Sequence, residues 1–250
     1  MSRTALVTGG ARRIGRAIVE GLARDGWSVV IHAHTSRAAA DELAQALRAR
    51  GTQAWVVAGD LGDPASVPNI MTTAVDVAGP IAALINNASR FERDDIASVS
   101  PESFGPHMRT NCLAPMLLTQ AFARQLPEGV SGAVINLLDQ RVWKPVPDFL
   151  SYGVSKAALW WLTRTLAQAL APAIRVNAVG PGPVFQSIHQ SRDQFARQVS
   201  AVPLARAASP EEIWQAVRYL LEAPSVTGQM IAVDGGQHLA WATPDVLGVE

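Results

Sequence analysis

The chain has 250 residues, of which 48% are hydrophobic, and its 21 Lys and Arg residues balance 21 Asp and Glu residues. This balance argues against bulk binding to nucleic acid or to an anionic membrane, so any phosphate recognition must be local. The single cysteine, Cys112, excludes an intrachain disulfide and a cysteine-based zinc site. Because no apolar stretch approaches the roughly 18 residues of a membrane span and no export signal opens the chain, we expect a cytoplasmic protein.

Short apolar runs alternate with helical patterns along the whole chain. The runs predict strands over residues 4–8, 28–33, 53–58, 81–86, 133–138, 174–179 and 230–233. Helices are predicted over residues 13–24, 36–50, 65–77, 102–125, 152–171 and 211–222, the fourth of them interrupted or bent by internal prolines. Continuously apolar strands that alternate with helices predict a single α/β domain, with a doubly wound parallel sheet covered by helices on both faces. The long irregular stretch 181–210 is expected to form a lid over a site.

The turn between the first strand and the first helix is rich in glycine. Glycine lets the backbone turn tightly and approach a pyrophosphate, whose charge sits at the N-terminus of the helix. The spacing departs from the usual G-x-G-x-x-G, and such turns also occur without a ligand, so a purely structural role is the alternative. The candidate cofactor residues of this turn are Thr8, Gly9, Arg12, Arg13, Ile14 and Gly15.

The end of the second strand indicates which dinucleotide would fit. A site for NAD usually has an acid at this point, which holds the ribose 2′-hydroxyl. The chain has His34, Thr35 and Ser36 instead, followed by Arg37. Together with Arg13 these residues would accept a 2′-phosphate, which favours NADP. Alternatively, Thr35 or Ser36 caps the next helix, and both roles are compatible.

Polar residues also follow the third and fourth strands. Asp60 would suit the adenine amino group, with Leu61 as a further cofactor contact. Asn86, Asn87 and Ala88 would line the adenosine ribose and backbone. Ordinary strand-end turns have similar sequences, so a structural role is again the alternative.

Tyr152 and Lys156 lie four residues apart, so a helix would place both side chains on one face. A lysine ammonium beside a phenol favours the phenolate, so we expect Lys156 to lower the pKa of Tyr152 from its usual value of about 10. Such a tyrosine could pass a proton near neutral pH. Asp139, which follows the fifth strand, is a second candidate for this chemistry.

Taken together, these motifs resemble the short-chain dehydrogenase/reductase family over essentially the whole chain. The matching residues are Thr8-Gly9, Gly15, Asp60, Asn86-Asn87-Ala88, Asn111, Tyr152, Lys156, Asn177, Pro181-Gly182 and Val233-Asp234-Gly235-Gly236. The resemblance implies a Rossmann-type, seven-stranded sheet, hydride transfer from a nicotinamide, and a homotetramer. It also implies that Tyr152 donates the proton, that Lys156 holds the cofactor ribose, and that Asn111 anchors a water in the proton relay. Pro181 and Gly182 would contact the cofactor.

One position departs from the family pattern. The family normally has a serine thirteen residues before the tyrosine, where it holds the substrate carbonyl, and this chain has Asp139. Asp139 could be a structural turn residue, a decayed position, or a carboxyl group that the substrate requires. A carboxyl group can pair with N–H donors and can help to protonate an imine nitrogen, whereas a carboxylate would repel a developing alkoxide.

The chain is similar to the branch of pteridine reductases and dihydromonapterin or dihydrofolate-type reductases, which carry an aspartate at that position. In this branch Ser89 would contact the cofactor and substrate, and the ring of Phe91 would stack on the pterin, although Phe91 could also be a core residue. We therefore expect an NADPH-dependent reductase of a dihydropterin, whose substrate contacts Ser89, Phe91, Asp139 and Tyr152. The rivals are an NADPH-dependent carbonyl reductase of an oxoacyl, sugar or other ketone, and a non-catalytic protein that senses NADP.

Two positions remain open. Gln186, Ser187 or neither would contact the nicotinamide amide. Within the tail 237–250, residues 238–241 are expected near the substrate pocket of their own or of a neighbouring subunit, with a frayed end as the alternative. The histidines show no metal-ligand spacing, so we expect no metal site.

Overall fold

The structure is a computed structural model that describes residues 3–241. It confirms the α/β prediction, because seven parallel strands form one sheet in the order β3-β2-β1-β4-β5-β6-β7. The strands are β1 (Thr4–Val7), β2 (Ser28–Ala33), β3 (Ala54–Ala58), β4 (Ala83–Asn86), β5 (Gly132–Leu137), β6 (Ile174–Pro181) and β7 (Met230–Val233). The strand order reverses between β1 and β4, so the loops after these strands diverge and leave a crevice at the carboxyl edge of the sheet.

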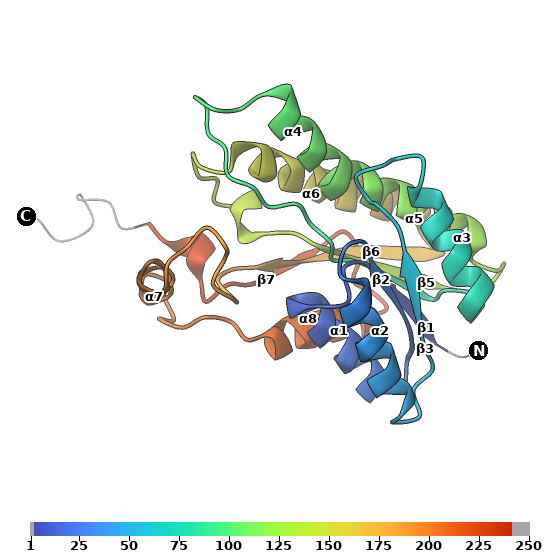
Figure 1. Cartoon of the computed structure of the whole chain (residues 1–250). Helices are drawn as coiled ribbons and strands as arrows, with labels where there is room; N and C mark the ends of the chain where they lie inside the picture. Colours follow the sequence, from blue (N-terminus) through green and yellow to red (C-terminus); the bar gives the residue numbers. More distant parts are fainter. Residues whose placement is uncertain (1–2, 242–250) are drawn as a thin grey trace, which may run out of the picture.

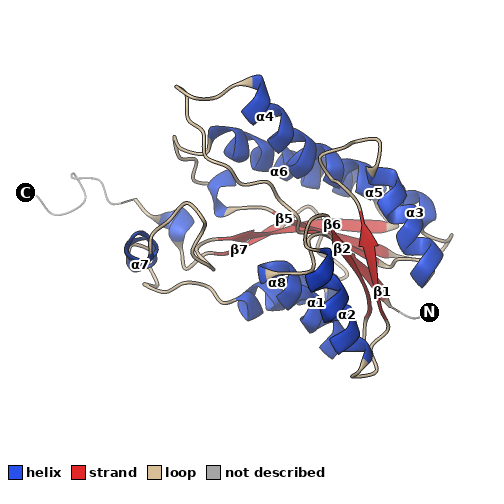
Figure 2. Ribbon diagram, viewed as in Figure 1, coloured by secondary structure: helices blue, strands red, loops and turns tan. Residues whose placement is uncertain are grey.

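Helices cover both faces of this sheet (Figure 1). One face carries α1 (Arg13–Arg24), α2 (Arg37–Arg48) and α8 (Pro210–Glu222). The other carries α3 (Val67–Ala78), α4 (Pro101–Met108), α5 (Ala114–Gln125) and α6 (Leu150–Leu170). Figure 2 shows this division into helix, sheet and helix layers, with the short helix α7 (Arg192–Ser200) set apart beyond the end of β7. Among residues 3–241, none of the helices has the length and apolar character needed to cross a membrane.

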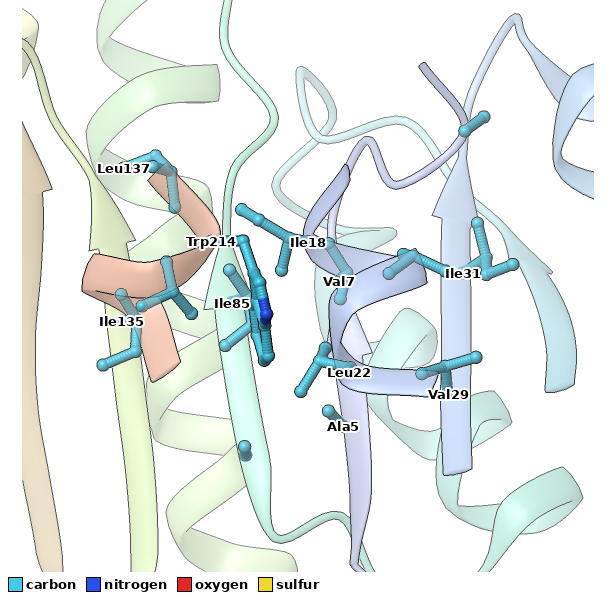
Figure 3. Packing of buried hydrophobic residues seen from close by; sticks show 14 of the residues in the cluster. Ala5, Val7, Ile18, Leu22, Val29, Ile31, Ile85, Ile135, Leu137 and Trp214 are labelled. Carbon is cyan, nitrogen blue, oxygen red and sulfur yellow. The ribbon is translucent and has the colours of Figure 1, made fainter. Parts of the chain in front are cut away.

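Two apolar layers hold the helices on the sheet. On the α1 face, the Trp214 ring of α8 packs beside Ile18 and Leu22 of α1 above the strands (Figure 3). A β-carbon on Gly21 would lie 2.3 Å from that ring, so α1 and α8 can approach this closely only because Gly21 has no side chain. Each large side chain buried in these layers stabilises the fold by about 1.5–3 kcal/mol. The sheet is therefore a rigid base for the loops at its carboxyl edge.

The predicted helix over 102–125 is interrupted, as its prolines indicated. It is divided into α4, a π-helical turn (Arg109–Leu113) and α5. Pro115 has no N–H to donate to the carbonyl of Asn111, so the regular α-helical hydrogen-bond pattern cannot continue at this point. Asn111 consequently lies in the π-helical turn.

The prediction that 181–210 is irregular throughout was wrong, because this stretch contains α7. Ser191 caps α7 and pairs with Gln194 in a capping box, which is a readable signal for a helix start. However, α7 buries none of its residues. Its apolar face is limited to the half-buried Phe195 and Val199, which is too short a pattern to predict a helix from periodicity alone.

Candidate active site

The carboxyl edge of the sheet opens into a cavity of about 680 Å³. The turns after β1, β4, β5 and β6 line it, together with the start of α6 and part of the stretch that leads into α7. The sequence-predicted residues that line this cavity are Arg13, Ile14, Asn87, Ser89, Phe91, Asp139, Tyr152, Lys156, Pro181 and Gly182. Side chains predicted from distant parts of the sequence thus share one space.

The glycine-rich turn after β1 is fixed by Asn87 and Thr8. The Asn87 side-chain amide donates to the carbonyls of Thr8 (2.9 Å) and Gly9 (3.2 Å). The Thr8 hydroxyl accepts from the backbone N–H groups of Asn87 (2.9 Å) and Ala88 (3.0 Å). A β-carbon on Gly15 would lie 2.2 Å from the Gly9 carbonyl oxygen, so only glycine fits there. A glycine-rich turn that protein hydrogen bonds hold in place at the start of a helix fits the pyrophosphate of a dinucleotide.

His32 also supports this turn, and the sequence analysis missed it. Its ring is buried; Nδ1 accepts from the N–H of Gly9 (3.3 Å), and Nε2 lies 3.1 Å from the Gly59 carbonyl, to which it donates in this tautomer. Burial lowers the pKa of His32 from 6.5 to about 4, so the ring is neutral at pH 7. His32 therefore connects the glycine-rich turn to the end of β3.

The residues expected at the adenosine end lie along the same edge, outside the cavity lining. His34 is 3.7 Å from the Asp60 carboxylate, and both side chains are at least half exposed. Ser36 occupies the N-cap position of α2, but its side chain makes no capping hydrogen bond. Thr35 lies between His34 and Ser36 in the sequence, and Leu61 follows Asp60. The Ser36 hydroxyl is thus not used by the helix, which leaves it available to a phosphate.

Arg13 lines the cavity at the start of α1. Its guanidinium donates to the carbonyl of Gln186 (3.4 Å) and lies 4.9 Å from the centre of the Phe185 ring, so it contacts the segment after β6. Arg12 is exposed just before α1, and Arg13 is exposed as well. Of the two candidates for the nicotinamide amide, Ser187 lines the cavity, whereas Gln186 contacts Arg13 through its backbone.

Asp139 and Tyr152 form a direct pair in the cavity. The Tyr152 hydroxyl donates to Oδ2 of Asp139 at 3.0 Å. The other carboxylate oxygen, Oδ1, accepts from the backbone N–H of Arg141 at 2.9 Å and caps a short 3-10 turn (Gln140–Val142). One carboxylate thus both orders the turn after β5 and faces the tyrosine.

Lys156 lies beneath the tyrosine ring. Its ammonium donates to the Leu137 carbonyl (2.7 Å) and is 5.8 Å from the centre of the Tyr152 ring. Burial lowers the pKa of Lys156 to about 8. The prediction that the pKa of Tyr152 is lowered was wrong, because burial and then the Asp139 charge raise this pKa well above its usual value.

Asn111 is fully buried, and its side-chain amide is saturated. The amide nitrogen donates to the Arg90 carbonyl and the Ser155 hydroxyl, both at 2.9 Å. The amide oxygen accepts from the N–H of Arg90 (2.7 Å) and the hydroxyl of Ser89 (3.2 Å). The side chain therefore holds the turn after β4 against α6 and has no capacity left for a water.

Two phenylalanine rings stack in the cavity. The Phe91 and Phe149 centroids are 4.5 Å apart with an interplanar angle of 6°, and Tyr152 meets Phe91 edge-on at 4.7 Å. Phe149 precedes α6 in a left-handed conformation (φ 59°), and its N–H donates to the Asp94 carbonyl at 2.7 Å. The sequence analysis missed Phe149, because a contact with a ring 58 positions earlier leaves no local pattern.

The start of the C-terminal tail approaches this region. Gln237 lines the cavity, and His238 contacts the Asp234 carboxylate at 2.7 Å and the Trp143 ring at a centroid distance of 5.1 Å. Residues 242–250 of the predicted tail lie outside the described part of the chain.

The chain is similar to known proteins over nearly its full length. A family model described as enoyl-(acyl carrier protein) reductase matches residues 9–238. Among solved structures, FolM alternative dihydrofolate reductase 1 from Brucella suis in complex with NADP has a TM-score of 0.94 at 48% identity, and covers 97% of this chain and 98% of its own. The FolM protein of Brucella canis complexed with NADP gives a TM-score of 0.92 at 47% identity, with 98% of both chains covered.

A more distant relative carries a different activity in its name. The 3-oxoacyl-[acyl-carrier-protein] reductase of Synechocystis sp. is 30% identical over 240 residues, which cover 94% of this chain and 96% of the relative. The family match, the parallel seven-stranded sheet and the paired tyrosine and lysine agree with one another. The chain therefore belongs to the short-chain dehydrogenase/reductase family.

Proposed function

We propose that the chain is an NADPH-dependent reductase that converts a dihydropterin, of the dihydromonapterin, dihydrobiopterin or dihydrofolate type, to its tetrahydro form. The observation that carries the proposal is the hydrogen bond of 3.0 Å from Tyr152 to Asp139, in a cavity also lined by Phe91. Similarity to two proteins named alternative dihydrofolate reductases, both in complex with NADP, supports the cofactor and the substrate class.

NADPH, when bound, supplies the hydride. The pyrophosphate would lie on the glycine-rich turn from Thr8 to Gly15, which the Asn87 side chain holds in place. The remaining cofactor contacts that we propose are Arg12, Arg13, Ile14, His34, Thr35, Ser36, Asp60, Leu61, Ala88, Ser89, Tyr152, Lys156, Pro181 and Gly182.

The substrate bond to be reduced would be a carbon–nitrogen double bond. The carbon receives the hydride, the nitrogen receives a proton, and the cofactor leaves oxidised. Tyr152 and Asp139 together would supply that proton, which solvent then restores. The carboxylate of Asp139 also suits a pterin because it can accept hydrogen bonds from ring N–H and amino groups.

Restoration of the proton would involve a water at Asn111. Since the Asn111 amide is saturated by protein groups, such a water would bind the backbone carbonyl, to which Pro115 has no N–H to donate. The side chain then has a supporting role, because it holds the π-helical turn in place.

An NADPH-dependent carbonyl reductase is the second candidate, and the name of the Synechocystis relative favours it. Reduction of a ketone or oxoacyl group develops negative charge on oxygen, and a carboxylate in the place of the usual serine opposes this charge. A non-catalytic NADP sensor is a weaker candidate, because the site retains Tyr152, Lys156 and Asn111 together.

We also propose a cytoplasmic homotetramer. Trp161 on the outer side of α6 is 64% exposed and Val154 on the same helix is 41% exposed. An indole this exposed on a helix surface suits contact with a second copy of the chain.

A panel of substrates tests the function. Purified protein with NADPH is offered dihydromonapterin, dihydrobiopterin, dihydrofolate and a set of ketones, and nicotinamide oxidation is followed. We expect turnover on at least one dihydropterin, with NADH a much poorer donor. Turnover on ketones alone would overturn the proposal, and cofactor binding without any turnover would favour a sensor.

A further inference from the structure

Arg141 lies in the site, yet the chemistry described above does not use it. It follows Asp139 by two residues on the 3-10 turn after β5. Its backbone N–H donates to Oδ1 of Asp139 at 2.9 Å, and its Nη1 atom is 3.9 Å from Oδ2, the oxygen that accepts from Tyr152. One residue therefore contacts both oxygens of the carboxylate, one through its backbone and one through its charge.

The Arg141 guanidinium is enclosed by aromatic rings. Its central carbon is 5.2 Å from the centre of the Phe149 ring, 5.6 Å from Phe91 and 5.9 Å from Tyr152. Only 20% of the side chain is exposed, whereas Arg93 at the same cavity is 62% exposed. A cation packed on rings and shielded from water acts on its neighbours with little screening.

The charges around Tyr152 can be counted. Asp139 is its hydrogen-bond partner, and among residues 3–241 Lys156 and Arg141 are the cations within 6 Å of its ring centre. His107 lies farther away, with its ring centre at 6.5 Å, and His189 faces the neighbouring rings Phe91 and Phe149 at 5.7 Å. Loss of the tyrosine proton would leave two negative charges about one hydrogen bond apart, and Lys156 and Arg141 would balance them.

We infer that Arg141 is a positioning residue, which holds the Asp139 carboxylate toward Tyr152 and whose charge balances the phenolate that forms when the proton leaves. This inference rests on the proposed reduction. The proton leaves the Tyr152 hydroxyl for the substrate nitrogen while the hydride passes to the adjoining carbon, and solvent later reprotonates the phenolate. Burial and Asp139 raise the pKa of Tyr152, and the Arg141 charge acts against both.

Substitution of the side chain alone tests the inference. Arg141→Gln removes the charge but keeps the backbone N–H that caps Asp139, so the turn is preserved. An opposite charge at 4–6 Å shifts a pKa by ~1–3 units. We therefore expect the alkaline limb of the kcat profile on a dihydropterin to move up by ~1 pH unit or more, and kcat at pH 7 to fall by ~10-fold.

Two further variants separate charge from structure. Arg141→Lys retains the charge, so the alkaline limb of its kcat profile should lie close to that of the unaltered protein. Arg218→Gln removes a surface arginine that pairs with Asp25 and Glu222, and should leave the profile unchanged. A profile of Arg141→Gln that overlays on that of the unaltered protein would overturn the inference, as would a failure of Arg141→Lys to restore it.

A measurement without substrate keeps this test distinct from the proposed function. The chain has two tyrosines, and Tyr219 is exposed on α8. Tyr219→Phe therefore leaves Tyr152 as the one tyrosine whose carbon-13 NMR signal reports ionisation, up to the pH at which the fold is lost. Arg141→Gln in this background should delay the onset of ionisation. Coincident curves would refute the role of Arg141, whereas absent dihydropterin turnover would refute only the proposed function.

Discussion

Asp139 is the residue whose substitution best separates the proposed chemistry from its rivals. Asp139→Asn preserves size and one oxygen, which can still accept the Arg141 N–H that lies 2.9 Å from the carboxylate. The 3-10 turn should therefore survive, and the free energy of unfolding should change by no more than about 1 kcal/mol, the typical value of one net hydrogen bond. The variant loses only the negative charge that faces Tyr152.

The kinetic effect should be much larger than the effect on stability. A positioned acid–base group contributes about 10²- to 10⁴-fold to a rate. Since Tyr152 remains as a donor, we expect kcat on the dihydropterin to fall by at least ~10-fold, with the Kd for NADPH unchanged. Steady-state kinetics, NADPH binding and thermal unfolding of the same preparation provide the three measurements. An unchanged kcat would reduce Asp139 to a turn residue.

Asp139→Ser extends the same test to specificity. It places at this position the hydroxyl that the family normally has there, and it removes the carboxylate that opposes an alkoxide. We expect the ratio of ketone turnover to dihydropterin turnover to rise. A parallel loss on both substrate types would show that Asp139 supports the site in general and does not select the substrate.

Three further predictions concern the groups that hold the site together. The unfolded chain binds a proton at His32 near pH 6.5 and the folded chain only near pH 4, so the free energy of unfolding should fall as the pH drops through this window, by about 2–3 kcal/mol at pH 4.5. Denaturant unfolding of His32→Gln should lack this dependence on pH, and an equal dependence in the variant would assign it to other groups. Gly15→Ala would place a β-carbon 2.2 Å from the Gly9 carbonyl oxygen, and this clash should distort the turn that we propose for the phosphates. Calorimetry should therefore show NADPH binding weakened by at least ~10-fold, and unchanged binding would contradict the proposed cofactor site. The pKa of Lys156 is about 8 in the folded chain and 10.5 in the unfolded chain, so the unaltered protein should gain stability relative to Lys156→Met as the pH rises from 8 to 10.5. Thermal unfolding measures this difference, and a difference in Tm that stays constant with pH would argue against a buried ammonium.

The sequence predicted the parts of this site that depend on local pattern. Continuous apolar strands ending in glycine or asparagine placed Gly9 and Asn87 at one edge of a parallel sheet, because parallel strands share their carboxyl ends. The spacing of Tyr152 and Lys156 placed both on one side of α6. The prolines near Asn111 predicted the interruption that the π-helical turn shows.

Other features depend on contacts between distant parts of the chain. Phe149 stacks on Phe91 from a left-handed conformation, in which its N–H donates to the carbonyl of Asp94, far away in sequence. The direction of the Tyr152 pKa was wrong for a similar reason. Spacing revealed Lys156, but it could not show that the hydroxyl is buried and faces Asp139.

The charges in the cavity also bear on the class of substrate. Asp139, Lys156 and Arg141 carry one negative and two positive charges, so the site has one excess positive charge while Tyr152 is protonated. Transfer of that proton to a nitrogen leaves a neutral amine and a phenolate, and the four protein groups then sum to zero. Reduction of a ketone would consume the same proton and leave the same charges, so this sum does not distinguish the two acceptors. The position of the negative charge does, because the Asp139 carboxylate can accept hydrogen bonds from the ring N–H and amino groups of a pterin, whereas the oxygen of a ketone has no hydrogen to donate to it.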